Sequence, residues 1–153
     1  MKPEKKIALV GSAPSSVTMA PYADPTWIIW TCSPGAQPYI RRTDCHFEIH
    51  RWEPPGGPGG DKPWFTREYV DWMAKLSCPV LMIDKTSDIP NSQPYPKEMM
   101  LEKFGAFFFT SSLSWMFALA IAEGATEVGM YGVDMSHESE WEFQRSGCHY
   151  FIS

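Results

Sequence analysis

The chain has 153 residues, of which 44% are hydrophobic and 20% are charged, as is typical of one globular domain with a hydrophobic core. Its formal net charge of −5 argues against a nucleic-acid-binding or anionic-membrane-binding surface. We therefore expect a single domain over residues 1–153, with no nucleic-acid partner and no membrane partner.

The cysteines and the apolar runs predict a cytoplasmic protein. The four cysteines are widely spaced and form no C-x-x-C pair, so reduced thiols are the simplest interpretation. Ile7–Val10 is too short for a secretion signal. The apolar part of Phe104–Ala122 is about half of the roughly 20 residues that a membrane span needs, and we predict a core helix there.

The first half of the chain predicts three strands joined by short or irregular connections. Ile7–Val10 is a continuous apolar run, as expected for a parallel strand covered on both faces. Trp27–Trp30 is a second apolar run of this kind. Cys45–His50 is a third candidate strand that alternates between apolar and polar residues.

The polar face of the third strand permits two interpretations. His46, Glu48 and His50 would project on one side, where they could act as metal ligands or as an acid–base pair. A metal would need a further ligand, such as Asp134 or His137. An ordinary half-exposed strand face is the favoured interpretation, and no metal site is predicted.

The second half begins with a loop and then alternates helices with strands. The proline- and glycine-rich stretch Glu53–Gly60 is either a surface excursion or a lid over a nearby site. A helix should begin at Thr66 and end before Pro79, and Val80–Ile83 should be the fourth strand. Ser87–Pro96 reads as a loop and Lys97–Phe104 as a short helix.

The stretch from Thr110 to Asp134 predicts a capped helix followed by a buried strand. Thr110, Ser111 and Ser112 offer hydroxyls where the apolar helix Leu113–Ala122 begins. Val128–Val133 should be the fifth strand, and it ends at Asp134. The polar tail after residue 135 should be partly helical.

Strands that alternate with helices or loops predict an α/β fold, a doubly wound sheet of about five mainly parallel strands. Ligands of such sheets bind beyond the carboxyl ends of the strands. The segments expected at that edge are Gly11–Ser16, Thr31–Gly35, His50–Trp52, Asp84 and Asp134–His137.

The loop after the first strand, Gly11-Ser12-Ala13-Pro14-Ser15-Ser16, has two interpretations. Gly11 permits a close backbone approach, and Ser15 and Ser16 offer hydroxyls and N–H groups to a phosphate. A plain strand–turn–helix junction would have a similar sequence. The loop lacks the further glycines of a dinucleotide fingerprint and the ending of a Walker A loop.

Two motifs together resemble those of a Rossmann-like superfamily. One is the G-x-A/G-P-S loop at Gly11–Ser15, and the other is Ser-Ser…Ala-x-x-x-Gly-Ala-x-Glu-Val-x-x-x-Gly-Val-Asp-Met, ending at Met135. The superfamily includes bacterial sialyltransferases that use a CMP-sugar, motility accessory factor glycosyltransferases and archaeal-type hydroxymethylpterin diphosphokinases. With the segment Gln144–Tyr150, the chain also resembles small uncharacterised bacteriophage proteins. The cytoplasm expected is therefore that of a bacterium or an infected host cell.

The resemblance implies a nucleotide or nucleotide-sugar ligand and no separate cofactor. It would place the ligand phosphates beside Gly11, Ala13, Pro14 and Ser15, with Ser12 and Ser16 in the same loop. Ser111 and Ser112 would face the same ligand from the helix start, and Gly132 and Asp134 would lie under the base or ribose. It also implies a catalytic histidine after the fifth strand, and His149 lies in roughly that region.

Two further residues at the predicted ligand edge could act on such a ligand. His50, at the end of the third strand, could handle a proton, and Arg145 could pair with a phosphate. Two functions remain open at this point. The protein is either a glycosyl- or phosphoryl-transferase-like enzyme, or a non-catalytic binder that sequesters a nucleotide-derived small molecule. The sequence leaves homo-oligomer formation open.

Overall fold

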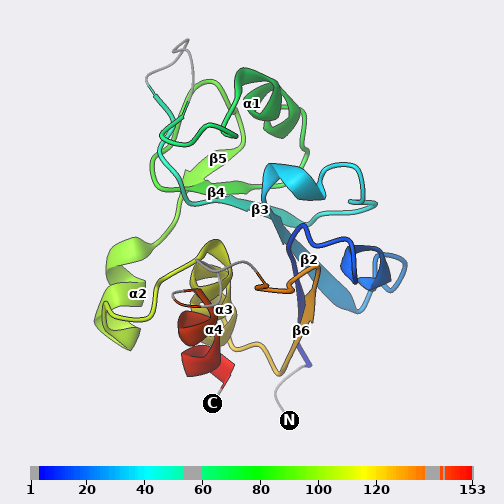
Figure 1. The fold of residues 1–153 in the computed structure, drawn as a ribbon, viewed down its shortest axis with the longest axis vertical. Helices are drawn as coiled ribbons and strands as arrows, with labels where there is room; N and C mark the ends of the chain where they lie inside the picture. The colour runs from blue at the N-terminus through cyan, green and yellow to red at the C-terminus, as the bar shows by residue number, and fades with distance from the viewer. Residues whose placement is uncertain (1–3, 54–59, 137–141, 143, 153) are drawn as a thin grey trace.

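The computed structural model describes residues 4–53, 60–136, 142 and 144–152, and it is built on a six-stranded sheet (Figure 1). All neighbouring strands pair in parallel, in the order β5-β4-β3-β2-β1-β6. The strands are β1 (Lys6–Val10), β2 (Trp27–Cys32), β3 (Cys45–Glu48), β4 (Val80–Met82), β5 (Ser92–Pro94) and β6 (Glu127–Tyr131).

Helices cover both faces of the sheet, which confirms the predicted α/β, doubly wound architecture. Figure 1 shows α2, α3 and α4 on one side of the sheet and α1 on the other. The helices are α1 (Arg67–Met73), α2 (Lys97–Phe104), α3 (Ser112–Ala122) and α4 (Arg145–Ile152), with short 3-10 turns η1 (Val17–Met19) and η2 (Pro34–Ala36).

The five predicted strands are all present, and the sixth, β5, lies in the predicted loop Ser87–Pro96. β5 has only three residues and ends at Pro94. It pairs with β4 alone, at the edge of the sheet, where a proline is tolerated because one side of the strand needs no partner. So short a strand has no apolar pattern from which to predict it.

The face of the sheet toward α3 is apolar. Ile7 and Leu9 of β1, with Trp30 of β2 and Phe47 of β3, pack against α3 residues such as Met116. Successive strand residues point to opposite faces, so the other face carries Ala8 and Val10 toward η1 and Val80 and Met82 toward α1.

The β3 residues on that second face are buried, so the predicted half-exposed strand face is wrong. His46 is 0% exposed and Glu48 is 2% exposed. The cause is α1, whose Tyr69 hydroxyl bonds His46 and whose Trp72 ring packs against the imidazole at 5.0 Å between centroids. The helix predicted from Thr66 therefore covers the polar residues of β3.

Two remaining features bear on the cellular setting. The four cysteines are buried and unpaired, as expected for reduced thiols. None of the helices within the described part of the chain is long and apolar enough to cross a membrane.

Candidate functional site

A cavity of about 790 Å³ lies beyond the carboxyl ends of β1, β2, β3 and β6. Its volume is in the usual range for small-molecule sites. The strand order turns back at β1, which has β2 on one side and β6 on the other, and such a point is where open α/β sheets bind ligands. The predicted residues that line the cavity are Gly11, Ser12, Ala13, Pro14, His50, Ser111, Ser112, Gly132 and Asp134.

The loop after β1 is fixed to the end of β6 by backbone contacts. The Gly11 N–H donates to the Tyr131 carbonyl and the Ala13 N–H to the Gly132 carbonyl, both at 2.8 Å. A Cβ on Gly11 would lie 2.5 Å from the Gly132 oxygen, and Gly132 itself has a φ of +67°. The glycines therefore serve the close approach of two backbones. The N–H groups of Gly11 and Ala13 are bonded to Tyr131 and Gly132 and so are not available to a phosphate.

Ser15 and Ser16 tie the same loop to β6 through their side chains. The Ser15 hydroxyl donates to the Asp134 carboxylate. The Ser16 hydroxyl oxygen accepts the Gly132 N–H at 2.8 Å. Neither serine is among the residues that line the cavity. Both instead hold the loop against the segment that follows β6.

The start of α3 presents N–H groups to the cavity. Ser111 and Ser114 form a reciprocal capping box, in which each side chain accepts the other residue's N–H at 3.3 and 3.0 Å. The first turn of a helix has no internal partners for its N–H groups. The backbone N–H groups of Ser112 and Leu113 can therefore donate to a ligand. Both residues line the cavity, so the partial positive charge of the helix start is directed there.

Two residues of the cavity wall have an unusual backbone. Ser33 has a φ of 77° and Met135 a φ of 48°, the positive values among non-glycine residues of the described segments. Both line the cavity. Strained backbone of this kind gathers at functional sites because surrounding structure must hold it in place.

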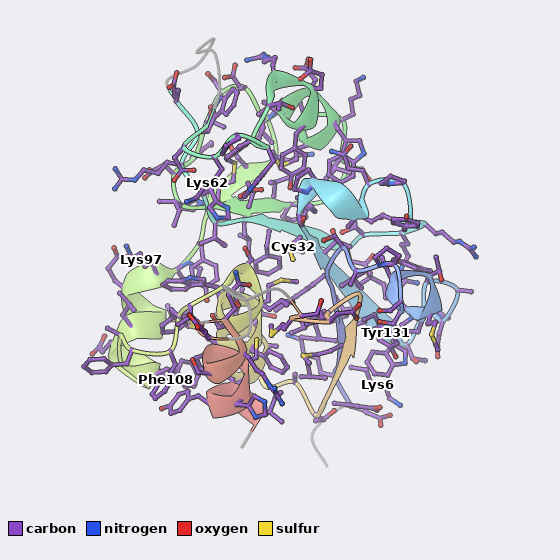
Figure 2. The ribbon with its side chains drawn as sticks, viewed as in Figure 1. Lys6, Cys32, Lys62, Lys97, Phe108 and Tyr131 are labelled. Carbon is purple, nitrogen blue, oxygen red and sulfur yellow. The ribbon has the colours of Figure 1, made fainter. Side chains whose placement is uncertain are left out.

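The opposite wall comes from the segment that follows β3 and from the segment that precedes α1. His50, Lys62 and Trp64 line it, and Figure 2 labels Lys62 and, from the end of β2, Cys32. The imidazole of His50 meets the Trp64 ring edge-on at 4.6 Å between centroids. Sequence reasoning missed Lys62 and Trp64. A basic and an aromatic residue beside a proline- and glycine-rich stretch were the only available signal.

A buried carboxylate holds His50 in place. Glu48 Oε1 lies 2.6 Å from His50 Nδ1 and 3.2 Å from the backbone nitrogen of His50. Glu48 is 2% exposed while the His50 side chain is 28% exposed. The pair thus extends from the interior of the sheet to the cavity wall.

Arg145 and His149 lie on α4 and are not among the residues that line the cavity. The Arg145 Nε donates to His149 Nε2 at 3.1 Å, one helical turn away. Gln144, just before α4, does line the cavity. Cys148 is buried, which raises the pKa of its thiol, so it is not activated as a nucleophile.

The remaining predicted residues either lie outside the described part of the chain or lie away from the cavity. The possible lid Glu53–Gly60 lies largely outside the described residues, and so does His137. Asp84 and Trp52 are not among the cavity-lining residues, and Trp52 instead donates its indole N–H to Asp88 at 2.7 Å. Across the described part of the chain, no three His, Cys, Asp or Glu residues are grouped so that they could hold a metal ion.

One solved structure shares this architecture. The sialyltransferase CstII from Campylobacter jejuni, in complex with a substrate analogue, cytidine-5'-monophosphate, aligns with a TM-score of 0.53 over 97% of this chain and 76% of that one. The fold is similar to that of a sialyltransferase. Sequence identity is 13%, so the similarity confirms the predicted Rossmann-like, glycosyltransferase-like fold alone. No protein-family model matches the chain, and no curated protein matches it.

Proposed function

We propose that the cavity binds a nucleotide or a nucleotide-sugar. The observation that carries this proposal is the open first turn of α3, where Ser112 and Leu113 face a cavity of about 790 Å³. Helix starts of this kind bind phosphate groups through their free N–H groups and the helix dipole. The likeness to a CMP-bound sialyltransferase structure supports the same ligand class.

The other walls suit the remaining parts of such a ligand. Lys62 supplies a positive charge for a phosphate, and the Trp64 ring, 39% exposed, offers an aromatic surface for a base. Asp134 is exposed at the end of β6 and would accept hydrogen bonds from the ribose or the base. Gly11–Pro14 closes the cavity beside the phosphate as a fixed turn.

For the reaction, transfer of the sugar is favoured over simple sequestration. The observation that favours it is the Glu48–His50 pair at the cavity wall, since a binder needs no oriented imidazole there. A sequestering protein would need only the helix start, Lys62 and Asp134. His149 and Arg145 remain candidates for catalysis and phosphate binding only if the ligand extends toward α4.

Calorimetric titration with a panel of nucleosides, nucleotides and CMP-, UDP- and GDP-sugars tests the ligand class. We expect at least one phosphorylated member to bind and its unphosphorylated nucleoside to bind at least tenfold more weakly, about 1.4 kcal/mol. Lys62→Ala should weaken binding by a factor of about 3 to 10, because one charged contact is lost from an exposed side chain.

Lys97→Ala is the matched control. Lys97 is also an exposed lysine, at the start of α2 and away from the cavity lining (Figure 2), so its loss should leave affinity unchanged. Binding by no phosphorylated nucleoside in the panel would refute the proposal.

A further inference from the structure

We propose that Glu48 is a positioning residue that holds His50 as a general base, with the free Nε2 of the imidazole turned to the cavity. This rests on the proposed function, because the base needs a hydroxyl-bearing substrate beside a nucleotide-sugar. The orientation itself is a property of the protein without ligand. It follows from three sets of contacts around one buried carboxylate.

The first contacts fix which nitrogen of His50 carries the proton. Glu48 Oε1 receives the backbone N–H of His50 and lies 2.6 Å from Nδ1. An ionised carboxylate can only accept hydrogen bonds, so Nδ1 must be the protonated nitrogen. The second nitrogen, Nε2, then has a lone pair, and His50 lines the cavity.

The second contact reaches Glu48 from α1. Burial and then the neighbouring charge and hydrogen bond of Glu48 raise the pKa of Tyr69 well above its usual value. Tyr69 is therefore a neutral phenol that lies near the carboxylate and can donate to it. With Tyr69 and two donors from His50, Glu48 has the partners that a buried negative charge requires.

The third set orders the Tyr69 hydroxyl. His46 Nε2 lies 2.6 Å from the Tyr69 oxygen, and Thr31 Oγ1 lies 2.8 Å from His46 Nδ1. When Tyr69 gives its proton to Glu48, His46 donates from Nε2 and accepts from Thr31 at Nδ1. Burial lowers the pKa of His46 to about 3, so the ring is neutral and can play both parts.

In that arrangement the donors run from Thr31 through His46 and Tyr69 to Glu48, and Glu48 also accepts from His50 at the cavity. Thr31 and His46 are 0% exposed, and polar groups at that depth cost stability unless every partner is present. Apolar residues of similar volume would fill the same space without that cost. The chain is therefore explained by what it does for His50, which is to fix its tautomer and ring orientation.

The proton-transfer step follows from this geometry. An acceptor hydroxyl or water gives its proton to His50 Nε2 as its oxygen bonds to the sugar carbon that carries the nucleotide phosphate. The bond from that carbon to the phosphate oxygen breaks, and the nucleotide leaves with the electron pair. The imidazolium that forms keeps Nδ1–H on Glu48, whose charge stabilises it.

The positioning claim is tested without ligand by NMR of ¹⁵N-histidine-labelled protein, with His50 assigned through His50→Gln. We expect the Nδ1–H tautomer of neutral His50 in the wild type. In Glu48→Leu no acceptor remains beside Nδ1, so the preference for the Nδ1–H tautomer should be lost and the two tautomers should mix. Glu127→Gln, an exposed carboxylate of β6 paired with Lys6, should leave the tautomer unchanged.

The catalytic claim is tested by release of CMP from a CMP-sugar. Glu48→Gln and His50→Gln should lower kcat by about 100-fold or more with little change in KM, while Glu127→Gln should behave as wild type. An Nε2–H tautomer in the wild type, or an unchanged tautomer in Glu48→Leu, would overturn the positioning role. A CMP-sugar that binds without ever being turned over would overturn the base. If no nucleotide binds, the proposed function fails, and the tautomer decides the positioning role alone.

Discussion

The two faces of the sheet solve different problems. Toward α3, the strand side chains are apolar, and Phe47 packs on Trp30 at 5.0 Å between ring centroids. Toward α1, the neighbouring β3 residues are His46 and Glu48, both buried. One face stabilises the fold by apolar burial, whereas the other accepts polar groups that reduce stability unless they are fully paired. On the polar face, the contact between Glu48 and His50 reaches the cavity wall.

The largest expected difference between the two faces is the pH dependence of stability that the buried His46 of the polar face causes. Burial lowers the pKa of His46 to about 3 from an ordinary 6.5, so between these values the unfolded chain binds a proton that the folded protein does not. The unfolding free energy should therefore fall as pH drops below about 6.5, with a slope of up to ~1.4 kcal/mol per pH unit from this group.

The variant His46→Gln isolates that contribution. It should remove this part of the slope between about pH 6.5 and pH 4, when urea denaturation is followed at each pH. Between about pH 6.5 and pH 4.5, the wild type should lose roughly 2–3 kcal/mol more unfolding free energy than His46→Gln does. Parallel pH curves for wild type and His46→Gln would show that the folded protein protonates the His46 ring over the same pH range as the unfolded chain.

A smaller effect comes from matched tyrosines on the two faces. Tyr69→Phe removes a buried hydroxyl that bonds His46 at 2.6 Å and lies near Glu48, so it should cost about 1–3 kcal/mol of stability. It should also mix the two tautomers of His50. Tyr95→Phe removes one bond to the Trp115 carbonyl on the α3 face and should cost about 1 kcal/mol.

The readout that separates the faces is the His50 tautomer in each variant. Tyr95→Phe should leave it as in the wild type, because Tyr95 belongs to the apolar cluster. If Tyr95→Phe disturbed His50 as much as Tyr69→Phe, the buried polar chain would have no special connection to the cavity.

The fold was predictable because its main elements carry strong local patterns. Ile7–Val10 and Val80–Ile83 are apolar runs that fit strands covered on both faces, and the hydroxyls before Leu113 predicted the capped start of α3 correctly. β5 had no such pattern. Its three residues are held by pairing with β4, which depends on tertiary structure.

The site was predictable only in part, because its wall contains residues far apart in sequence. The alternation in Cys45–His50 placed His46 and Glu48 on one face of β3 correctly, while His50 lies two residues past the strand. Nothing local showed that α1 would bury that face. Tyr69 appeared only as an apolar helix position, and its hydroxyl gains meaning from His46, 23 residues away. Likewise, Gly11 suggested a phosphate turn, while its close contact is with Gly132.

The most direct test of nucleotide binding is a ¹H–¹⁵N NMR titration with CMP that follows the backbone amides. We expect the largest shifts at Ser112 and Leu113, at the start of α3, with smaller shifts at Ser12 and Lys62. Shifts confined to the separate surface groove that includes Thr18–Asp24 and Arg41, or no shifts with CMP or any other nucleotide, would contradict it.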